Sequence, residues 1–101
     1  MKNKIYLVGS MGSGKSSIGR LLAKKLKLPH YDLDKIMEID QGMSISTIFQ
    51  KHNEEYFRNL ESITLEKYSK LSSFVISTGG GAILKEKNQK LFNEGCVIYL
   101  K

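Results

Sequence analysis

Short apolar runs alternate with amphipathic segments along the whole chain. The run from Lys4 to Val8 is followed at once by glycine, which is typical of a strand that enters a tight turn. The stretch "FVIST", residues 74–78, is almost continuously apolar, as expected for a strand that helices cover on both faces. The stretch "CVIYL", residues 96–100, has the same character. The pattern predicts a strand at each place and predicts Cys96 as a small residue of the buried core.

Between these runs, apolar residues recur at helical spacing. The first such segment starts at Ser16 and is closed by Pro29, with apolar positions at Ile18, Leu21, Leu22 and Leu26. A longer helix is predicted from Asn53, because two glutamates follow in the first turn, where negative charge favours the helix dipole. Its apolar stripe consists of Phe57, Leu60, Thr64, Tyr68 and Leu71. A third helix is predicted over residues 82–93, with Gly95 as its stop.

Shorter elements are predicted between the first two helices. The stretch "HYDLD", residues 30–34, predicts a short strand that ends at Asp34. A helical turn or two follows and is stopped by Gly42. Ser44 or Ser46 is then predicted to cap a short helix through Phe49.

The alternation of strands and helices predicts the fold class. Strands that alternate with helices form a parallel sheet with right-handed crossovers, so we expect a three-layer α/β fold. In such sheets ligands bind at the carboxyl ends of the strands. A chain of 101 residues is long enough for one domain, so residues 1–101 are expected to form a single domain without repeats or linkers.

Composition and charge narrow the classes of function. The chain is 41% apolar and 26% charged, and no apolar run is long enough to span a bilayer, so we expect a cytoplasmic protein without a membrane partner. Its net charge of +6 favours a protein that handles anions. Nucleic acid is not the expected anion, because the lysines are scattered without interleaved aromatic residues. The two histidines and the single cysteine are isolated from one another, so no zinc site is predicted.

The first loop carries a phosphate-binding motif. Residues 8–19 read "VGSMGSGKSSIG", in which Gly9, Gly14, Lys15 and Ser16 satisfy G-x-x-x-x-G-K-[ST] between a predicted strand and a predicted helix. Glycines allow backbone amides to approach phosphate oxygens, and the helix N-terminus adds partial positive charge. In this motif Lys15 reaches the β and γ phosphates and the Ser16 hydroxyl coordinates Mg²⁺. The predicted nucleotide-binding residues are Gly12, Ser13, Gly14, Lys15, Ser16 and Ser17.

Three further groups of residues are candidates for chemistry. Alternation along a strand would put Asp32 and Asp34 on one side, where one holds a metal through water and the other accepts a hydroxyl proton. Arg58 and Glu61 are three residues apart and share a helix face, although a surface ion pair would have the same spacing. Three successive glycines, residues 79–81, indicate a close approach to the backbone, or else a flexible loop.

Together these motifs resemble those of the shikimate kinase family. The resemblance rests on "GSMGSGKSSIGRLLA", "DLD", "IF" followed by "FRNLE", "STGGGAIL", and the later spacing of Asn88, Leu91, Gly95 and "VIYL", which together cover nearly the whole chain. It implies a P-loop kinase fold of the nucleoside-monophosphate-kinase type. The implied reaction is ATP-dependent, Mg²⁺-dependent phosphorylation of the 3-hydroxyl of shikimate.

The resemblance also implies a role for each candidate residue. Asp34 would bind the reacting hydroxyl and act as its base, and Lys15 would neutralise charge on the transferred phosphoryl group. Ser16 would ligate Mg²⁺, and Asp32 would order its waters. Arg58 would bind the shikimate carboxylate while Glu61 holds it in place. Phe57 would line the pocket, and the backbone of Gly79, Gly80 and Gly81 would contact substrate.

Family members continue into a C-terminal lid, a last strand and a last helix that have no counterpart in these 101 residues. Because a lid excludes water and delivers an arginine, we expect little or no kinase activity from the 101-residue chain alone. We also expect a monomer. Two alternatives stay open, namely a gluconate-type small-metabolite kinase and a non-catalytic nucleotide-binding module.

Overall fold

The computed structural model describes residues 3–9, 15–79, 81–82 and 85–100. Strands and helices alternate through these residues in the predicted manner. The elements are β1 (Lys4–Gly9), α1 (Lys15–Leu26), β2 (His30–Asp32), α2 (Leu33–Gln41), α3 (Ile45–Lys51), α4 (Glu54–Ser69), β3 (Phe74–Gly79), α5 (Glu86–Asn93) and β4 (Cys96–Leu100).

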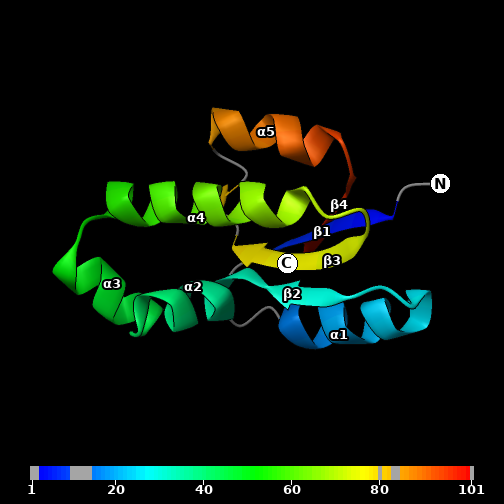
Figure 1. Cartoon of the computed structure of the whole chain (residues 1–101), viewed down its shortest axis with the longest axis horizontal. Coiled ribbons are helices and arrows are strands. Elements are labelled where there is room, and N and C mark those ends of the chain that lie inside the picture. Colours follow the sequence, from blue (N-terminus) through cyan, green and yellow to red (C-terminus); the bar gives the residue numbers. More distant parts are fainter. Residues whose placement is uncertain (1–2, 10–14, 80, 83–84, 101) are drawn as a thin grey trace.

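The four described strands form one parallel sheet in the order β2-β3-β1-β4. Helix α1 covers one face of this sheet, while α4 and α5 lie on the other face (Figure 1). Helices α2 and α3 extend beyond the end of β2, at the side of the molecule to which the strands point (Figure 1). The predicted three-layer α/β fold is therefore confirmed.

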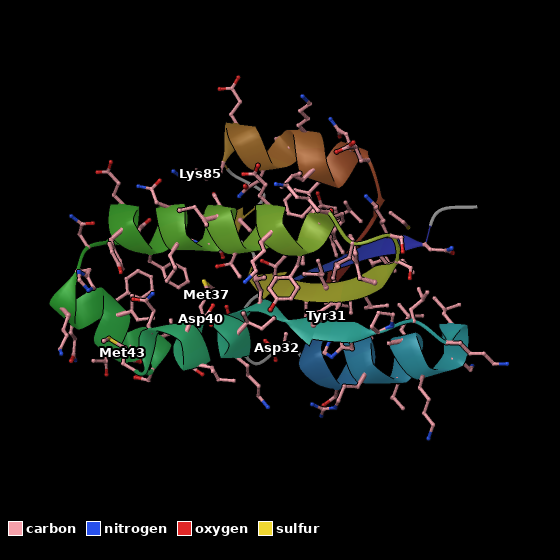
Figure 2. The ribbon with its side chains drawn as sticks, viewed as in Figure 1. Tyr31, Asp32, Met37, Asp40, Met43 and Lys85 are labelled. Atoms are coloured by element: carbon pink, nitrogen blue, oxygen red, sulfur yellow. The ribbon has the colours of Figure 1, made fainter. Side chains whose placement is uncertain are left out.

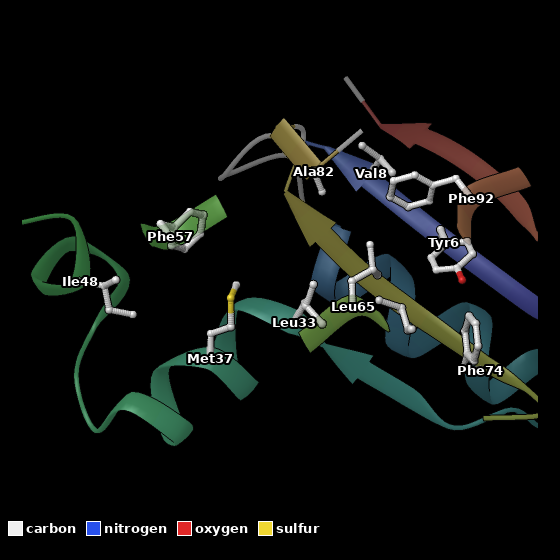
Figure 3. Packing of buried hydrophobic residues seen from close by; sticks show 11 residues of the cluster. Tyr6, Val8, Leu33, Met37, Ile48, Phe57, Leu65, Phe74, Ala82 and Phe92 are labelled. Carbon is white, nitrogen blue, oxygen red and sulfur yellow. The ribbon is translucent and has the colours of Figure 1, made fainter. Parts of the chain in front are cut away.

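Two clusters of buried residues hold the layers together. The larger cluster lies on the α4 and α5 face, where Tyr6 packs edge-to-face against Phe74 and Phe92 at centroid distances of 5.2 and 4.9 Å. Figure 3 shows Tyr6 between these two rings. The same cluster includes Met37 of α2 and Ile48 of α3, so the core continues past the ends of the strands. The smaller cluster, on the α1 face, consists of Ile5, Leu7, Ala23 and Val75.

The orientation of α1 differs from the one that its apolar pattern suggests. Ile18, Leu21 and Leu26 are exposed, with 42%, 68% and 47% of their surface accessible. Gly19 and Ala23 are buried against the sheet, and of the predicted apolar stripe only Leu22 packs against the smaller cluster, because α1 lies very close to β2 and β3. A Cβ atom at Gly19 would lie 2.6 Å from Oγ of Ser77, which is too close for any side chain. The close approach of the helix to the strands, rather than its largest apolar residues, therefore determines which face of α1 is buried.

The expectation that Cys96 is buried is wrong. Cys96 is exposed, as are Ile98 and Tyr99 on the same strand. Strand β4 lies at the edge of the sheet and has a hydrogen-bonded neighbour among the described strands on one side only. An apolar run at such an edge has less of the molecule to pack against than the central strands have.

The predicted boundaries are correct where a capping side chain defines them. Ser44 Oγ accepts a hydrogen bond from Thr47 N at 3.2 Å at the start of α3, and Asn53 Oδ1 accepts one from Tyr56 N at 2.8 Å at the start of α4. Gly42 ends α2 in the left-handed conformation, with φ of 67°. The helix predicted over residues 82–93 begins only at Glu86.

Candidate functional site

The carboxyl ends of β1, β2 and β3 lie together at one end of the sheet, which we call the carboxyl edge. Gly9 at the end of β1 pairs with Gly79 at the end of β3, and Asp32 at the end of β2 pairs with Ser77 of β3. Because α1 begins at Lys15, its N-terminus follows β1 at the same edge. This is the place where parallel α/β folds bind their ligands.

The residues on either side of the predicted nucleotide loop, Gly9 and Lys15, are described by the structure and lie at the carboxyl edge. Gly12, Ser13 and Gly14 lie outside the described residues, as do the side chains of Lys15 and Ser16. The backbone of Lys15 and Ser16 forms the first turn of α1, and Ser17 is exposed there. The N-terminus of this twelve-residue helix therefore places its partial positive charge at the carboxyl ends of the strands.

The two aspartates do not share a strand. Strand β2 ends at Asp32, and Leu33 begins α2, so the predicted strand through Asp34 is wrong. Asp32 caps α2, where its Oδ1 accepts a hydrogen bond from Lys35 N at 3.4 Å (Figure 2). Asp34 lies in the first turn of α2 and is half-buried. The two aspartates are predicted to lie on one side of a strand because side chains alternate along it. The chain changes from strand to helix between them, so this alternation does not apply.

Arg58 and Glu61 form a pair within α4. Arg58 Nη1 donates a hydrogen bond to Glu61 Oε1 at 3.0 Å, as their i, i+3 spacing predicts. The pair is not a surface pair, because Glu61 is only 1% exposed whereas the Arg58 side chain is 26% exposed. A buried carboxylate therefore orients a guanidinium that remains accessible to a ligand. Glu54 adds a longer contact, 3.9 Å from Arg58 Nε, at the surface.

The pKa of Glu61 reflects its burial. Removal from water raises this pKa, and the hydrogen bond and the positive charge of Arg58 lower it. The Asp34 carboxylate raises it further, and the Lys85 ammonium lowers it. Since these charges act on Glu61, the carboxylate of Asp34 and the cation of Arg58 belong to one electrostatic environment. A carboxylate from α2 and the Arg58–Glu61 pair of α4 therefore interact electrostatically.

The glycine segment after β3 lies against this pair. A Cβ atom at Gly79 would stand 3.6 Å from Glu61 Oε2, an ordinary contact distance. A Cβ atom at Gly81 would collide with the guanidinium of Arg58. Gly80 lies outside the described residues. The close approach that the triple glycine predicts is therefore confirmed at Gly81, and the group that approaches is a side chain of the protein itself.

Aromatic rings form the wall beside Arg58. Phe57 is 5% exposed, and its ring packs against that of Phe49 with 4.6 Å between centroids. Cζ of Arg58 lies 5.3 Å from the centre of the Phe57 ring, within the range of a cation–π contact. Phe57 thus supports the guanidinium directly.

Two residues near this site were not among the sequence candidates. Asn88 of α5 is 1% exposed and donates a hydrogen bond from Nδ2 to the Ala82 carbonyl at 2.9 Å. Lys85 donates from Nζ to Asn59 Oδ1 at 3.1 Å, beside α4 and near the start of α5 (Figure 2). Lys85 belongs to no motif with fixed spacing, whereas Asn88 is part of the spaced pattern with Leu91 and Gly95 on which the family resemblance rests, although that pattern assigns it no role.

No metal centre made of protein ligands alone is present among the described residues. They contain no group of three or more histidine, cysteine, aspartate or glutamate side chains arranged to hold a metal ion. Within the same residues, no helix is long and apolar enough to cross a membrane.

The sheet order, the motif after β1 and the interacting charges of α2 and α4 define an α/β fold of the P-loop kinase class. Comparison with known proteins agrees and is more specific. The family model described as shikimate kinase matches residues 11–101. The shikimate kinase of Caldicellulosiruptor bescii is 48% identical over 99 residues. This chain belongs to the shikimate kinase family.

Solved structures give the same result. The chain superposes on shikimate kinase from Acinetobacter baumannii, determined in complex with shikimate, with a TM-score of 0.92 and 39% identity over 99% of this chain. A gluconokinase from Sinorhizobium meliloti, at 20% identity and a TM-score of 0.60 over 97% of this chain, shares the fold alone. This chain spans 57% of the Caldicellulosiruptor protein, 56% of the Acinetobacter structure and 55% of the gluconokinase.

Proposed function

We propose that this chain provides the nucleotide loop and the carboxylate-binding arginine of an ATP-dependent kinase that phosphorylates the 3-hydroxyl of shikimate. The observation that carries the proposal is the placement of Arg58. Its guanidinium is held by buried Glu61, faces Gly81 and shares its surroundings with Asp34 at the carboxyl ends of the strands.

Arg58 suits a small carboxylate ligand. A guanidinium presents parallel N–H donors that match the two oxygens of a carboxylate, whereas an ammonium does not. The 3.0 Å bond to Glu61 and the Phe57 ring fix its orientation before a ligand arrives. Because the guanidinium is already oriented, less conformational entropy is lost when a ligand binds. A ring acid such as shikimate would be held by its carboxylate at Arg58.

Asp34 is the residue suited to the reacting hydroxyl. It lies half-buried in the first turn of α2, directly after the carboxyl end of β2, and its charge raises the pKa of Glu61, the residue that holds Arg58. A carboxylate within hydrogen-bond reach of a substrate hydroxyl orients it and accepts its proton. Held at the carboxylate by Arg58 and at the hydroxyl by Asp34, the substrate would have one orientation.

The described residues fit a magnesium nucleotide. The N-terminus of α1 lies at the carboxyl edge of the sheet and favours anionic phosphates. Ser16 and Asp32 would offer hydroxyl and carboxylate oxygens, which are the ligand types that Mg²⁺ prefers, in part through water. Lys15 would add a positive charge at the phosphates. When bound, the magnesium nucleotide supplies the phosphoryl group.

The direct test is ADP release measured with a coupled assay in the presence of shikimate or gluconate. For a protein that contains this chain and is as long as its relatives, we expect ADP release with shikimate and none with gluconate. Arg58→Lys keeps the charge and should raise the shikimate KM by about tenfold, because a bidentate contact is worth roughly 1–3 kcal/mol. For the 101-residue chain alone we expect ADP binding and little or no turnover.

Two results would contradict the proposal. Turnover with gluconate and not with shikimate would favour the gluconate-type kinase, whose relative shares this fold. Nucleotide binding without turnover of either acceptor, at full length, would favour a non-catalytic nucleotide-binding module.

A further inference from the structure

Asn88 is a buried polar side chain that bonds to the backbone at Ala82, the residue that follows the three glycines. Its Nδ2 donates to the Ala82 carbonyl at 2.9 Å, and the residue is 1% exposed. A buried polar group is costly unless it is hydrogen-bonded. Breaking this bond would therefore leave both the Asn88 amide and the Ala82 carbonyl with a lost partner inside the protein. Ala82 is itself fully buried in the main core cluster. The segment after β3 is thus fixed at Ala82 by its methyl group and by its carbonyl.

The fixed point is adjacent to the arginine site. Ala82 directly follows Gly81, and a Cβ atom at Gly81 would collide with the guanidinium of Arg58. The peptide unit that joins Gly81 to Ala82 ends at the Ala82 Cα, which carries both the buried methyl group and the bonded carbonyl, so a displacement of this Cα moves Gly81 with it. Gly81 forms part of the surface against which Arg58 rests, so the position of Ala82 affects the position of the guanidinium.

Other contacts hold this segment less tightly. Lys85 N donates to the same Ala82 carbonyl at 3.4 Å, a longer bond than that of Asn88. Lys85 Nζ reaches Asn59 Oδ1 at 3.1 Å, but that bond is exposed and competes with water. The buried amide of Asn88 is therefore the main polar restraint on the described part of this segment.

We infer that Asn88 is a positioning residue for the carboxylate-binding arginine. It holds Ala82, which sets Gly81 against Arg58, and so keeps the guanidinium oriented for a carboxylate. This inference rests on the proposed function for the identity of the ligand, but not for the contacts among the protein's own residues.

The first experiment is the Asn88→Ala variant of the protein at the length of its relatives. We expect the shikimate KM to rise about tenfold, since loss of one charge-assisted hydrogen bond between the guanidinium and the carboxylate costs about tenfold in affinity. The KM for ATP should stay unchanged, and kcat should change far less than the shikimate KM. In an Arg58→Ala background the same substitution should have no further effect on the shikimate KM, because Asn88 acts through Arg58.

Ser69→Ala is the matched control for lost stability. Ser69 is buried at the far end of α4, where its Oγ accepts from Tyr6 and donates to the Leu65 carbonyl at 2.9 and 2.7 Å. Its removal should lower the melting temperature while the shikimate KM stays unchanged. Equal effects of the two variants on the shikimate KM, or no effect of Asn88→Ala, would overturn the inference.

A second measurement does not depend on turnover. Exchange of the Arg58 Nε–H proton with water, followed by NMR without ligand, should become severalfold faster in Asn88→Ala and stay unchanged in Ser69→Ala. If the unsubstituted protein releases no ADP with shikimate, the proposed function fails, yet this exchange still decides the role of Asn88. Unchanged exchange in Asn88→Ala would overturn the inference even if the proposed function holds.

Discussion

Gly81 faces the guanidinium of Arg58 so closely that a Cβ atom at position 81 would overlap it. Glu61 binds the same guanidinium through a 3.0 Å hydrogen bond. The guanidinium thus lies between a side-chain acid of its own helix and the backbone of a different segment. Arg58 can therefore keep this orientation only when residue 81 has no side chain. This holds whether or not the glycines contact a ligand.

Gly81→Ala should weaken shikimate binding by about tenfold or more, because the new methyl group displaces Arg58 and a shift of about 1 Å at a binding group can cost ~100-fold. Titration calorimetry with shikimate measures this effect. Gly42→Ala is the control, since its Cβ meets nothing within 4 Å but its φ is 67°. It should cost about 1–2 kcal/mol of folding stability and leave shikimate binding unchanged. Equal affinity losses in both variants would contradict the steric account.

Glu61 should give the folded protein a distinct dependence of stability on pH. Its pKa is raised, chiefly by burial, so the folded protein keeps the proton at pH values where the unfolded chain has released it. Its contribution is fully present below the ordinary glutamate pKa and is lost as pH rises through the raised value. The slope should be smaller in Glu61→Gln, measured as the free energy of urea unfolding from about pH 4 to about pH 8.

Glu66→Gln makes the same change of charge at an exposed position of the same helix. It should leave the slope close to that of the unsubstituted protein. A slope altered as much by Glu66→Gln as by Glu61→Gln would show that net charge, rather than burial of Glu61, sets the pH dependence.

The features that could be predicted from sequence are those with local causes. The start of α4 depends on Asn53 and the start of α3 on Ser44, and each caps an amide three residues away. The Arg58–Glu61 pair follows from one turn of helix. The parallel sheet follows from the alternation of strands and helices. The residues of the caps and of the Arg58–Glu61 pair are three apart in sequence, so spacing alone contains the information, whereas the parallel pairing of distant strands is predicted from the order of the elements.

The features that could not be predicted depend on contacts between distant segments. Gly81 contacts Arg58 only because the segment after β3 lies against α4. Asn88 and Ala82 are only six residues apart, but they lie on either side of the start of α5, and six residues is not a spacing that a helix or a cap pairs. The apolar residues of α1 predicted a buried stripe, but the close approach of Gly19 to Ser77 determines which face turns inward. The exposure of Cys96 follows from the position of β4 in the sheet order, which the sequence of the strand does not contain.

Asp34→Asn should abolish most turnover and spare nucleotide binding. If Asp34 accepts the hydroxyl proton, its loss should lower kcat by about 100- to 10,000-fold. Coupled ADP release and titration with Mg-ADP measure the two effects separately. Asp40→Asn, at an exposed position of the same helix, should leave both unchanged. Full activity in Asp34→Asn would remove this carboxylate from the mechanism.

His30 should make the protein sensitive to acid. Its Nε2 lies 2.9 Å from Oγ of buried Ser77, and its pKa is lowered by burial, with the Asp32 charge opposing this and the Arg20 charge adding to it. Because the folded pKa lies below the ordinary histidine value, stability is present above that value and is lost as pH falls through the lowered one. His30→Gln should flatten this loss between about pH 6.5 and about pH 4, measured by urea unfolding. His52→Gln, which removes an exposed ring stacked on Tyr56, should keep the slope. If His52→Gln flattened the slope as much as His30→Gln, the buried contact with Ser77 would not be its source.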